Sequence, residues 1–358
     1  MWRATLLLAI ASCNGVCMAQ LSDAPIAQKK SLAADNPFRV QVTQPLHVSS
    51  VRPFEFPPFG YWGVPLCDSD GNLYFHAVPD MPAYDTISIL RLDPKGKSSI
   101  VYRMSAEYSD YLYQSASVSP SGLLYVLAQA RTGEYAIVSF KPDGFSRNPS
   151  KLSVPDNVVL TGLAAFDDES VLVQGHFEAR PHSHAQATDH KGERYLALVN
   201  SSGEITRTVE GKLEKVDLNA GPAIPPEAEG ALVTSAGNAI VISGKELLIL
   251  SQSAVVERKL PFERPDTSAV PVRLQVSGGL VAIEFVTVNK QHEVQAKYLV
   301  LNLQDGRRIG LFAGSDETGT RSVCFQYDEG FVFLQTDPKT GKQNRVVAEI
   351  PSMVDDQH

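Results

Sequence analysis

The sequence predicts an all-β fold, a six-bladed β-propeller with four-stranded blades, and two recurring turn motifs with a shared spacing carry that prediction. The first motif is a polar turn that runs into an apolar strand, DSDGNLYF at residues 68–75 and SPSGLLYV at residues 119–126. Weaker copies occupy residues 167–173, 235–241, 277–282 and 328–333.

The second motif lies between the third and fourth strands expected in each unit. It reads LDPKG at residues 92–96 and FKPDG at residues 140–144. Asp, Asn and Gly are favoured there because a hairpin turn needs a positive φ or an Asx turn. Further copies occupy residues 199–203 and 302–306, with a degenerate copy at residues 250–253. Both series recur about every fifty residues, a period typical of propeller blades.

The last unit, residues 320–353, ends after its expected third strand at residues 345–350. A strand expected near residues 38–48 would supply the missing fourth strand and close the ring, which removes an open sheet edge. The alternative is seven blades, with residues 38–51 starting a blade of their own. Residues 51–62 are expected to lie outside regular sheet, because three prolines in this stretch remove ladder donors.

The N-terminal residues are predicted to be a targeting segment. Residues 1–19 have a short positive start, an apolar stretch and small residues before Gln20, as in a secretory signal peptide. The alternative is a bacterial lipobox, IASC at residues 10–13, with Cys13 lipidated. Residues 20–37 are polar and expected to be a disordered leader or tether. The propeller is expected over residues 38–353, with a tail at residues 354–358, in a secreted or periplasmic protein or, alternatively, an envelope lipoprotein.

Charge and hydropathy limit the classes of binding partner that we expect. The chain of 358 residues has a formal net charge of -8, which disfavours nucleic-acid binding because phosphate recognition needs a basic surplus. No run of Lys and Arg suggests an anionic-membrane patch. No later segment approaches the ~20 apolar residues of a membrane helix. A monomer that binds a protein, peptide or glycan is therefore expected.

Two cysteines, Cys67 and Cys324, lie in the expected propeller. Each stands just before the first turn of its unit, in the first and the sixth blade, which are neighbours in a closed ring. A disulfide between them is one interpretation. Two separate buried thiols is the other, and the sequence favours it, because adjacent inner strands need not bring the Cα atoms within about 7 Å.

The chain resembles six-bladed propellers of the NHL-repeat-like kind. The resemblance depends on DGNLYF at residues 70–75 and SGLLYV at residues 121–126, and it covers the fold of residues 38–353. It implies a binding platform for proteins, peptides, sugars or nucleic acids, and a minority of such propellers are metal-dependent hydrolases or lyases. It assigns no functional residue.

One face of the ring is expected to carry function, because the loops after the second strands and the connectors between blades open there. The longest such loop, residues 177–194, contains three histidines that would accept Zn²⁺ or Ca²⁺; a solvated loop without metal is the favoured alternative. Aromatic side chains would form a platform for a sugar or peptide, although packing of the ring seam is the favoured alternative. For the histidines at the ends of second strands, ordinary rim positions are the favoured alternative. The candidate metal ligands are His182, His184 and His190, and the candidate binding residues are Tyr61, Trp62, Tyr108, Tyr111 and Tyr113, with His76 and His176 at the ends of second strands.

Catalytic motifs are missing from the sequence: it has no GxSxG, HExxH, P-loop or GxGxxG after a strand. A non-enzymatic binding or scaffold module that uses the loop-rich face is therefore expected, with no cofactor other than the metal considered above. The alternative function is that of a metal-dependent hydrolase or lyase.

Overall fold

The structure is a computed structural model, and the chain divides into two units, Met1–Val40 and Gln41–His358. The structure describes residues 42–55, 60–78, 88–108, 110–178, 192–209, 232–235, 237–288, 294–315, 317–318 and 321–350. All of them belong to the second unit. No helix within these ranges is long and apolar enough to cross a membrane.

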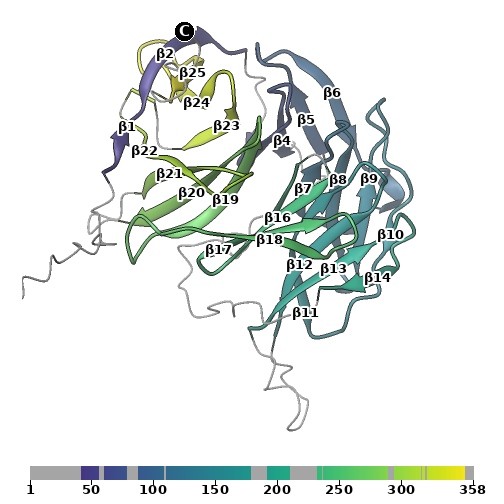
Figure 1. The fold of residues 1–358 in the computed structure, drawn as a ribbon. Coiled ribbons are helices and arrows are strands. Elements are labelled where there is room, and N and C mark those ends of the chain that lie inside the picture. The colour runs from purple at the N-terminus through teal and green to yellow at the C-terminus, as the bar shows by residue number, and fades with distance from the viewer. Residues whose placement is uncertain are drawn as a thin grey trace, which may run out of the picture. The chain divides into compact units, whose positions relative to one another are not determined.

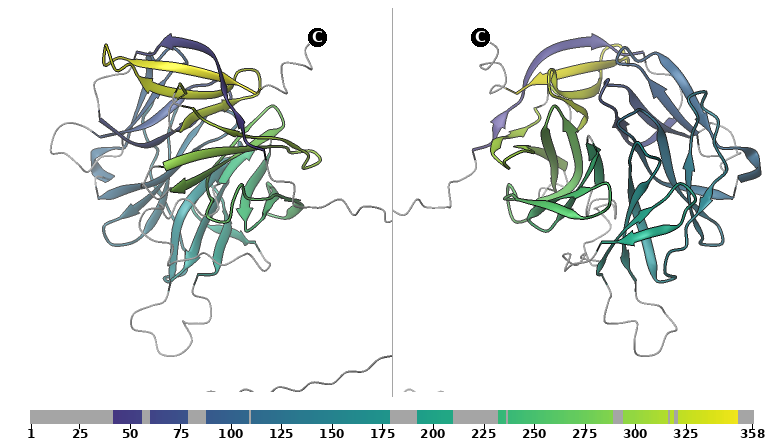
Figure 2. Two further views of the ribbon diagram at one scale, coloured as in Figure 1. Left: turned by 90° about the vertical axis from the view of Figure 1, so that its left-hand side faces the viewer. Right: turned by 45° about the vertical axis from the view of Figure 1, so that its right-hand side comes forward.

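Six antiparallel sheets form the second unit, which confirms the predicted six-bladed propeller (Figure 1, Figure 2). Blade one consists of β3(Gly60–Cys67), β4(Leu73–Val78), β5(Ser88–Leu92) and β6(Ser98–Arg103). Blade two consists of β7(Tyr111–Val118), β8(Leu124–Ala130), β9(Tyr135–Ser139) and β10(Ser150–Lys151). Blade three consists of β11(Val158–Ala165), β12(Val171–Phe177), β13(Arg194–Val199) and β14(Ile205–Thr208). Blade four consists of β15(Leu232–Ser235), β16(Asn238–Ser243), β17(Glu246–Ser251) and β18(Val256–Pro261). Blade five consists of β19(Val270–Ser277), β20(Leu280–Val288), β21(Val294–Asn302) and β22(Arg308–Ala313). Blade six is β23(Ser322–Gln326), β24(Gly330–Thr336), β25(Gln343–Glu349) and β2(His47–Pro53).

The first strand of every blade lines the centre of the ring. Contacts between these strands run in a closed cycle, from β3 through β7, β11, β15, β19 and β23 back to β3. The hydrophobic core lies between successive blades, because the side chains of each strand point alternately toward the preceding blade and the following blade. Tyr298 of blade five, for example, packs on Phe331 of blade six with ring centroids 4.6 Å apart.

The ring closes through β2, as predicted, although the closing strand lies at residues 47–53 and not near residues 38–48. The strand pairs with β25 from His47 opposite Glu349 to Pro53 opposite Asn344. The expectation that residues 51–62 avoid regular sheet was wrong for β2 and for the start of β3. Pro53 is tolerated because it ends a strand at the outer edge of its sheet, where its missing N–H removes no ladder bond.

A short strand precedes β2, within the residues 38–48 where a strand was expected, but it pairs with blade five and not with blade six. β1(Gln44–Pro45) pairs in parallel with β22 of blade five, and the Leu46 N–H then donates to the Ala313 carbonyl at 3.0 Å. Leu46 itself is buried between blades five and six. The segment before blade one therefore holds two blades at the seam of the ring.

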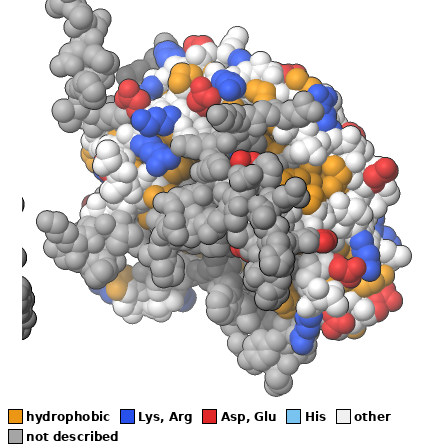
Figure 3. Space-filling model, turned by 90° about the horizontal axis from the view of Figure 1, so that it is seen from below, with side chains coloured by type: hydrophobic (Ala, Val, Ile, Leu, Met, Phe, Trp, Pro, Cys, Tyr) orange, Lys and Arg blue, Asp and Glu red, His pale blue; other side chains and the backbone are white. Residues whose placement is uncertain are grey.

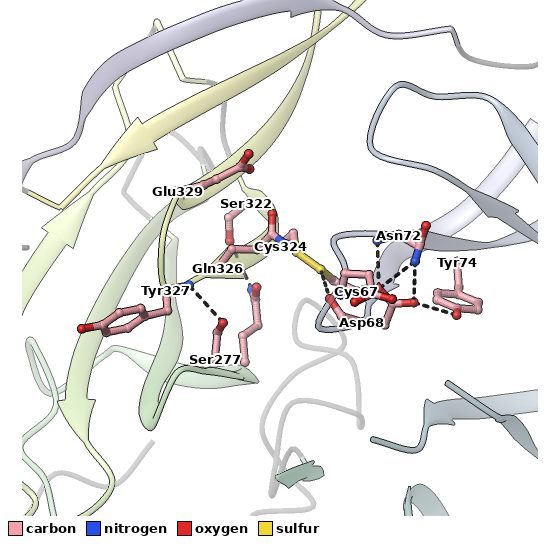
Figure 4. The surroundings of a disulfide bond; sticks show 12 residues. Cys67, Asp68, Asn72, Tyr74, Ser277, Ser322, Cys324, Gln326, Tyr327 and Glu329 are labelled. Atoms are coloured by element: carbon pink, nitrogen blue, oxygen red, sulfur yellow. Dashed lines mark hydrogen bonds between the residues drawn. A yellow bond between two sulfur atoms is a disulfide. The ribbon is translucent and has the colours of Figure 1, made fainter. Parts of the chain in front are cut away.

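Cys67 and Cys324 form a disulfide between blade one and blade six (Figure 4). Their Cα atoms are 5.4 Å apart, because β3 and β23 are adjacent inner strands in direct contact. The favoured expectation of two separate thiols was wrong. Asp68 follows the bridge and explains the first turn motif: its carboxylate accepts hydrogen bonds from the Asn72 N–H at 2.9 Å and the Tyr74 hydroxyl at 2.9 Å (Figure 4).

Two structural features require glycine at the end of the second turn motif: a positive φ and a close approach to the preceding blade. Gly144 has a φ of +89°, as the motif predicted, and a Cβ there would lie 2.5 Å from the Val101 carbonyl of the preceding blade. Gly203 contacts Lys151 of its preceding blade in the same way. The second turn of a blade is therefore also an inter-blade contact. Gly122, in a first turn, has a φ of +83°, but a Cβ added there would have no neighbouring atom within 4 Å.

Gly122 and Gly144 give a matched pair of substitutions. Gly122→Ala is expected to lower the free energy of unfolding by about 1–2 kcal/mol, the cost of a left-handed backbone with a Cβ. Gly144→Ala should lower it by about 1–3 kcal/mol more, because blade two must also move away from blade one. Urea unfolding of both variants measures the difference. Equal losses would show that the second turn does not position neighbouring blades.

Candidate functional site

The predicted metal ligands His182, His184 and His190 lie outside the described residues. Within the part of the chain that the structure describes, no group of three or more His, Cys, Asp or Glu side chains could hold a metal ion. The histidine site therefore stays a prediction.

An aromatic pair joins blades one and two on the face where the second strands end. His76 near the end of β4 stacks on Tyr113 near the start of β7, with ring centroids 4.1 Å apart and planes 17° from parallel. Both side chains are half-buried, so the pair is fixed by packing and still meets solvent. Burial lowers the pKa of His76. The ring is therefore neutral at pH 7, and no charge opposes its contact with an apolar ligand face.

Tyr108 and Tyr111 extend the same area. Tyr108 ends the short helix η1(Ala106–Tyr108) in the connector between the two blades, and Tyr111 begins β7. Both are half-buried and pack against the core between blades one and two. The structure thus brings three of the predicted tyrosines and His76 to one junction, which we call the aromatic junction: His76, Tyr108, Tyr111 and Tyr113.

The remaining binding candidates have different positions. The backbone of Trp62 pairs with His76, and that of Tyr61 pairs with Ala77, so both residues are in the first strand of blade one. His176 lies near the end of β12, two residues beyond the position that corresponds to His76 in blade one, and only 6% of it is exposed. Its Nε2 lies 3.7 Å from Glu178 Oε1, and burial lowers its pKa more than Glu178 raises it.

A buried charge cluster lies between blades five and six, and the sequence analysis did not identify it. Glu284 of β20 is 1% exposed, and its two carboxylate oxygens accept from Nε of Arg273 at 2.9 Å and Nε of Arg321 at 2.6 Å. A single acid inside the apolar run VAIEFV was the signal that could have located it, because a buried carboxylate needs charged partners.

Charges of both signs share the surface of the propeller. Figure 3 shows Lys and Arg side chains interspersed with Asp and Glu side chains over one side of the molecule. A mixed surface of this kind favours recognition by shape and stacking over steering by a single-signed field.

No protein-family model matches the sequence, and a search of curated proteins finds no match. Among solved structures, the chain is similar to a member of the DUF4221 family from Bacteroides vulgatus, with a TM-score of 0.55 and 10% identity over 85% of this chain and 96% of that chain. An apocarotenoid oxygenase from Synechocystis has a TM-score of 0.41 and 10% identity over 71% of this chain and 62% of that chain. The first similarity supports the propeller fold alone, and the second is too distant to support any inference.

Proposed function

We propose that this protein is an exported, non-enzymatic binding module, a propeller of the NHL-repeat-like kind that takes a peptide or glycan chain on its loop-rich face. The observation that carries the proposal is the aromatic junction, where His76 and Tyr113 stack and stay half-exposed. Aromatic faces stack on the apolar faces of sugars and on proline-rich chains, and a preorganised pair loses little entropy on binding.

The signal-like residues 1–19 and the disulfide support export, since disulfides persist in oxidising compartments. A secreted or periplasmic location follows in this proposal, with a lipid anchor at Cys13 as the alternative. Mass spectrometry of the mature N-terminus distinguishes them. Gln20 indicates the free form, and a lipid-modified Cys13 indicates the anchored form. The alternative function, metal-dependent hydrolysis, depends on the three histidines outside the described residues.

Ligand binding is tested with glycan and peptide arrays, followed by titration of any ligand found. Tyr111→Ser and Tyr113→Leu are each expected to weaken binding about tenfold, because one aromatic contact contributes about 1 kcal/mol beyond its buried area. The matched control is Phe145→Ser, which removes an exposed aromatic ring from the second turn of the same blade, at the opposite face. Equal losses in all three variants, or no bound glycan or peptide, would contradict the proposal.

A further inference from the structure

The central channel holds a cavity of about 310 Å³, lined by the first strands of blades one, two, four, five and six. Its lining includes the first-turn residues Ser69, Pro120 and Gly278, so it opens at the face opposite the aromatic junction. Much of the cavity wall consists of apolar side chains, among them Leu66, Val118, Val233 and Phe325. A cavity of this volume is within the range of small-molecule sites.

Two polar side chains in this cavity have buried atoms without partners among the described residues. Gln275 is 9% exposed, and its Nε2 donates to Ser322 Oγ at 3.3 Å while its Oε1 accepts no hydrogen bond. The Thr234 hydroxyl, from the neighbouring blade, is buried and unpaired as well. An unpaired buried polar group costs about 1–3 kcal/mol, so the cavity favours a ligand with hydrogen-bond donors.

The cavity also has a positive end. Arg273 lines it and shares the single carboxylate of Glu284 with Arg321, so two guanidinium groups face one buried acid. Nε and Nη2 of Arg273 each lie 2.9 Å from Glu284 Oε2, and Nη2 also donates to the carbonyl and hydroxyl of Ser322. No hydrogen bond of its Nη1 is found among the described residues. A guanidinium with a remaining donor and an uncompensated charge favours a carboxylate.

The spacing of the two anchors fits one ligand class. Gln275 follows Arg273 by two residues on β19, so both side chains leave the same side of the strand about 7 Å apart. We propose that the channel cavity binds a small hydroxycarboxylate of the sugar-acid class, with its carboxylate on Arg273 and a hydroxyl donating to Gln275 Oε1. This site goes beyond the proposed function, because it shares no residue with the aromatic junction.

Thermal shift and calorimetric titration of the purified chain test the proposal with gluconate and glucuronate. Both acids are expected to raise the melting temperature and bind with one-to-one stoichiometry. Glucose, which lacks the carboxylate, and acetate, which lacks hydroxyls, should produce no shift at equal ionic strength. A shift with glucose equal to that with the acids, or no binding of either acid at millimolar concentrations, would overturn the proposal.

Gln275→Met separates binding from folding. The substitution keeps the length of the side chain and removes the unpaired acceptor, so the free protein should be at least as stable as the parent. Binding of gluconate should become about tenfold weaker, since one hydrogen bond to the ligand is lost. Gln343→Met on β25, outside the cavity, is the control and should leave binding unchanged. Unchanged affinity in Gln275→Met would reject the assigned site.

Discussion

A chain that begins at residue 54 is expected to lose most of the stability of the propeller. Without β2, blade six keeps three strands, and the outer edge of β25 loses its ladder from His47 to Pro53. Leu46, which is 3% exposed, is also removed from the core between blades five and six. The buried Leu alone is worth about 2–5 kcal/mol, and each ladder bond adds about 0.5–1.5 kcal/mol. We expect the free energy of unfolding to fall by about 5 kcal/mol or more.

Urea unfolding and limited proteolysis measure this loss. The control is a chain that begins at Gln41, the first residue of the propeller unit, which should unfold at the same midpoint as the parent. A synthetic peptide of residues 41–54, added in trans, should restore part of the lost stability by refilling the edge of β25. If the chain from residue 54 unfolds at the parental midpoint, β2 does not close the ring.

Replacing both Cys67 and Cys324 by Ser is expected to destabilise the protein by up to about 5 kcal/mol. The disulfide joins residues 257 positions apart, and a long loop closed by a covalent bond greatly reduces the entropy of the unfolded chain. Guanidinium unfolding of the parent and the double variant, each with and without reductant, measures the effect. Reductant should lower the midpoint of the parent and leave that of the double variant unchanged.

A thiol titration provides the independent check. The chain from Gln41 contains Cys67 and Cys324 as its only cysteines, so it should show no reactive thiol when denatured without reductant. Two reactive thiols under these conditions would mean that the cysteines are not bonded. In the chain that begins at residue 54, the same double substitution should cost more than in the parent, because the direct chain connection from β2 to β3 is lost and the disulfide is then the covalent link that remains at the contact between β3 and β23.

The repeated turns made the fold predictable, because each turn requires particular residues at fixed positions in every blade. The position of the closing strand was harder to predict from the sequence. The alternation at residues 38–42 favoured a strand there, whereas β2 reads HVSSVRP and is exposed along most of its length. An edge strand that buries few side chains has no strong hydrophobic period, so tertiary pairing with β25 determined its place.

The candidate sites were predictable to different degrees. The aromatic junction was partly visible, since Tyr108, Tyr111 and Tyr113 lie close together in the sequence. The cavity was not predictable, because Arg273 and Gln275 bond to Ser322 of blade six and line one cavity with Thr234 of blade four only when three blades are in place. Single-sequence spacing contains no information on contacts between side chains that lie about fifty residues apart or more in neighbouring repeats.

The closing strand also determines the order in which the ring can be completed during synthesis. About 300 residues separate β2 from its partner β25, so at about 5–20 residues per second β2 leaves the ribosome roughly 15–60 s before that partner exists. Over that interval it is an unpaired strand, the kind of segment that promotes aggregation. The composition of β2 lowers this risk, because Ser49, Ser50 and Arg52 are polar, Pro45 precedes the strand and Pro53 is its last residue. The feature that makes β2 hard to find in the sequence thus protects the nascent chain until blade six can capture it.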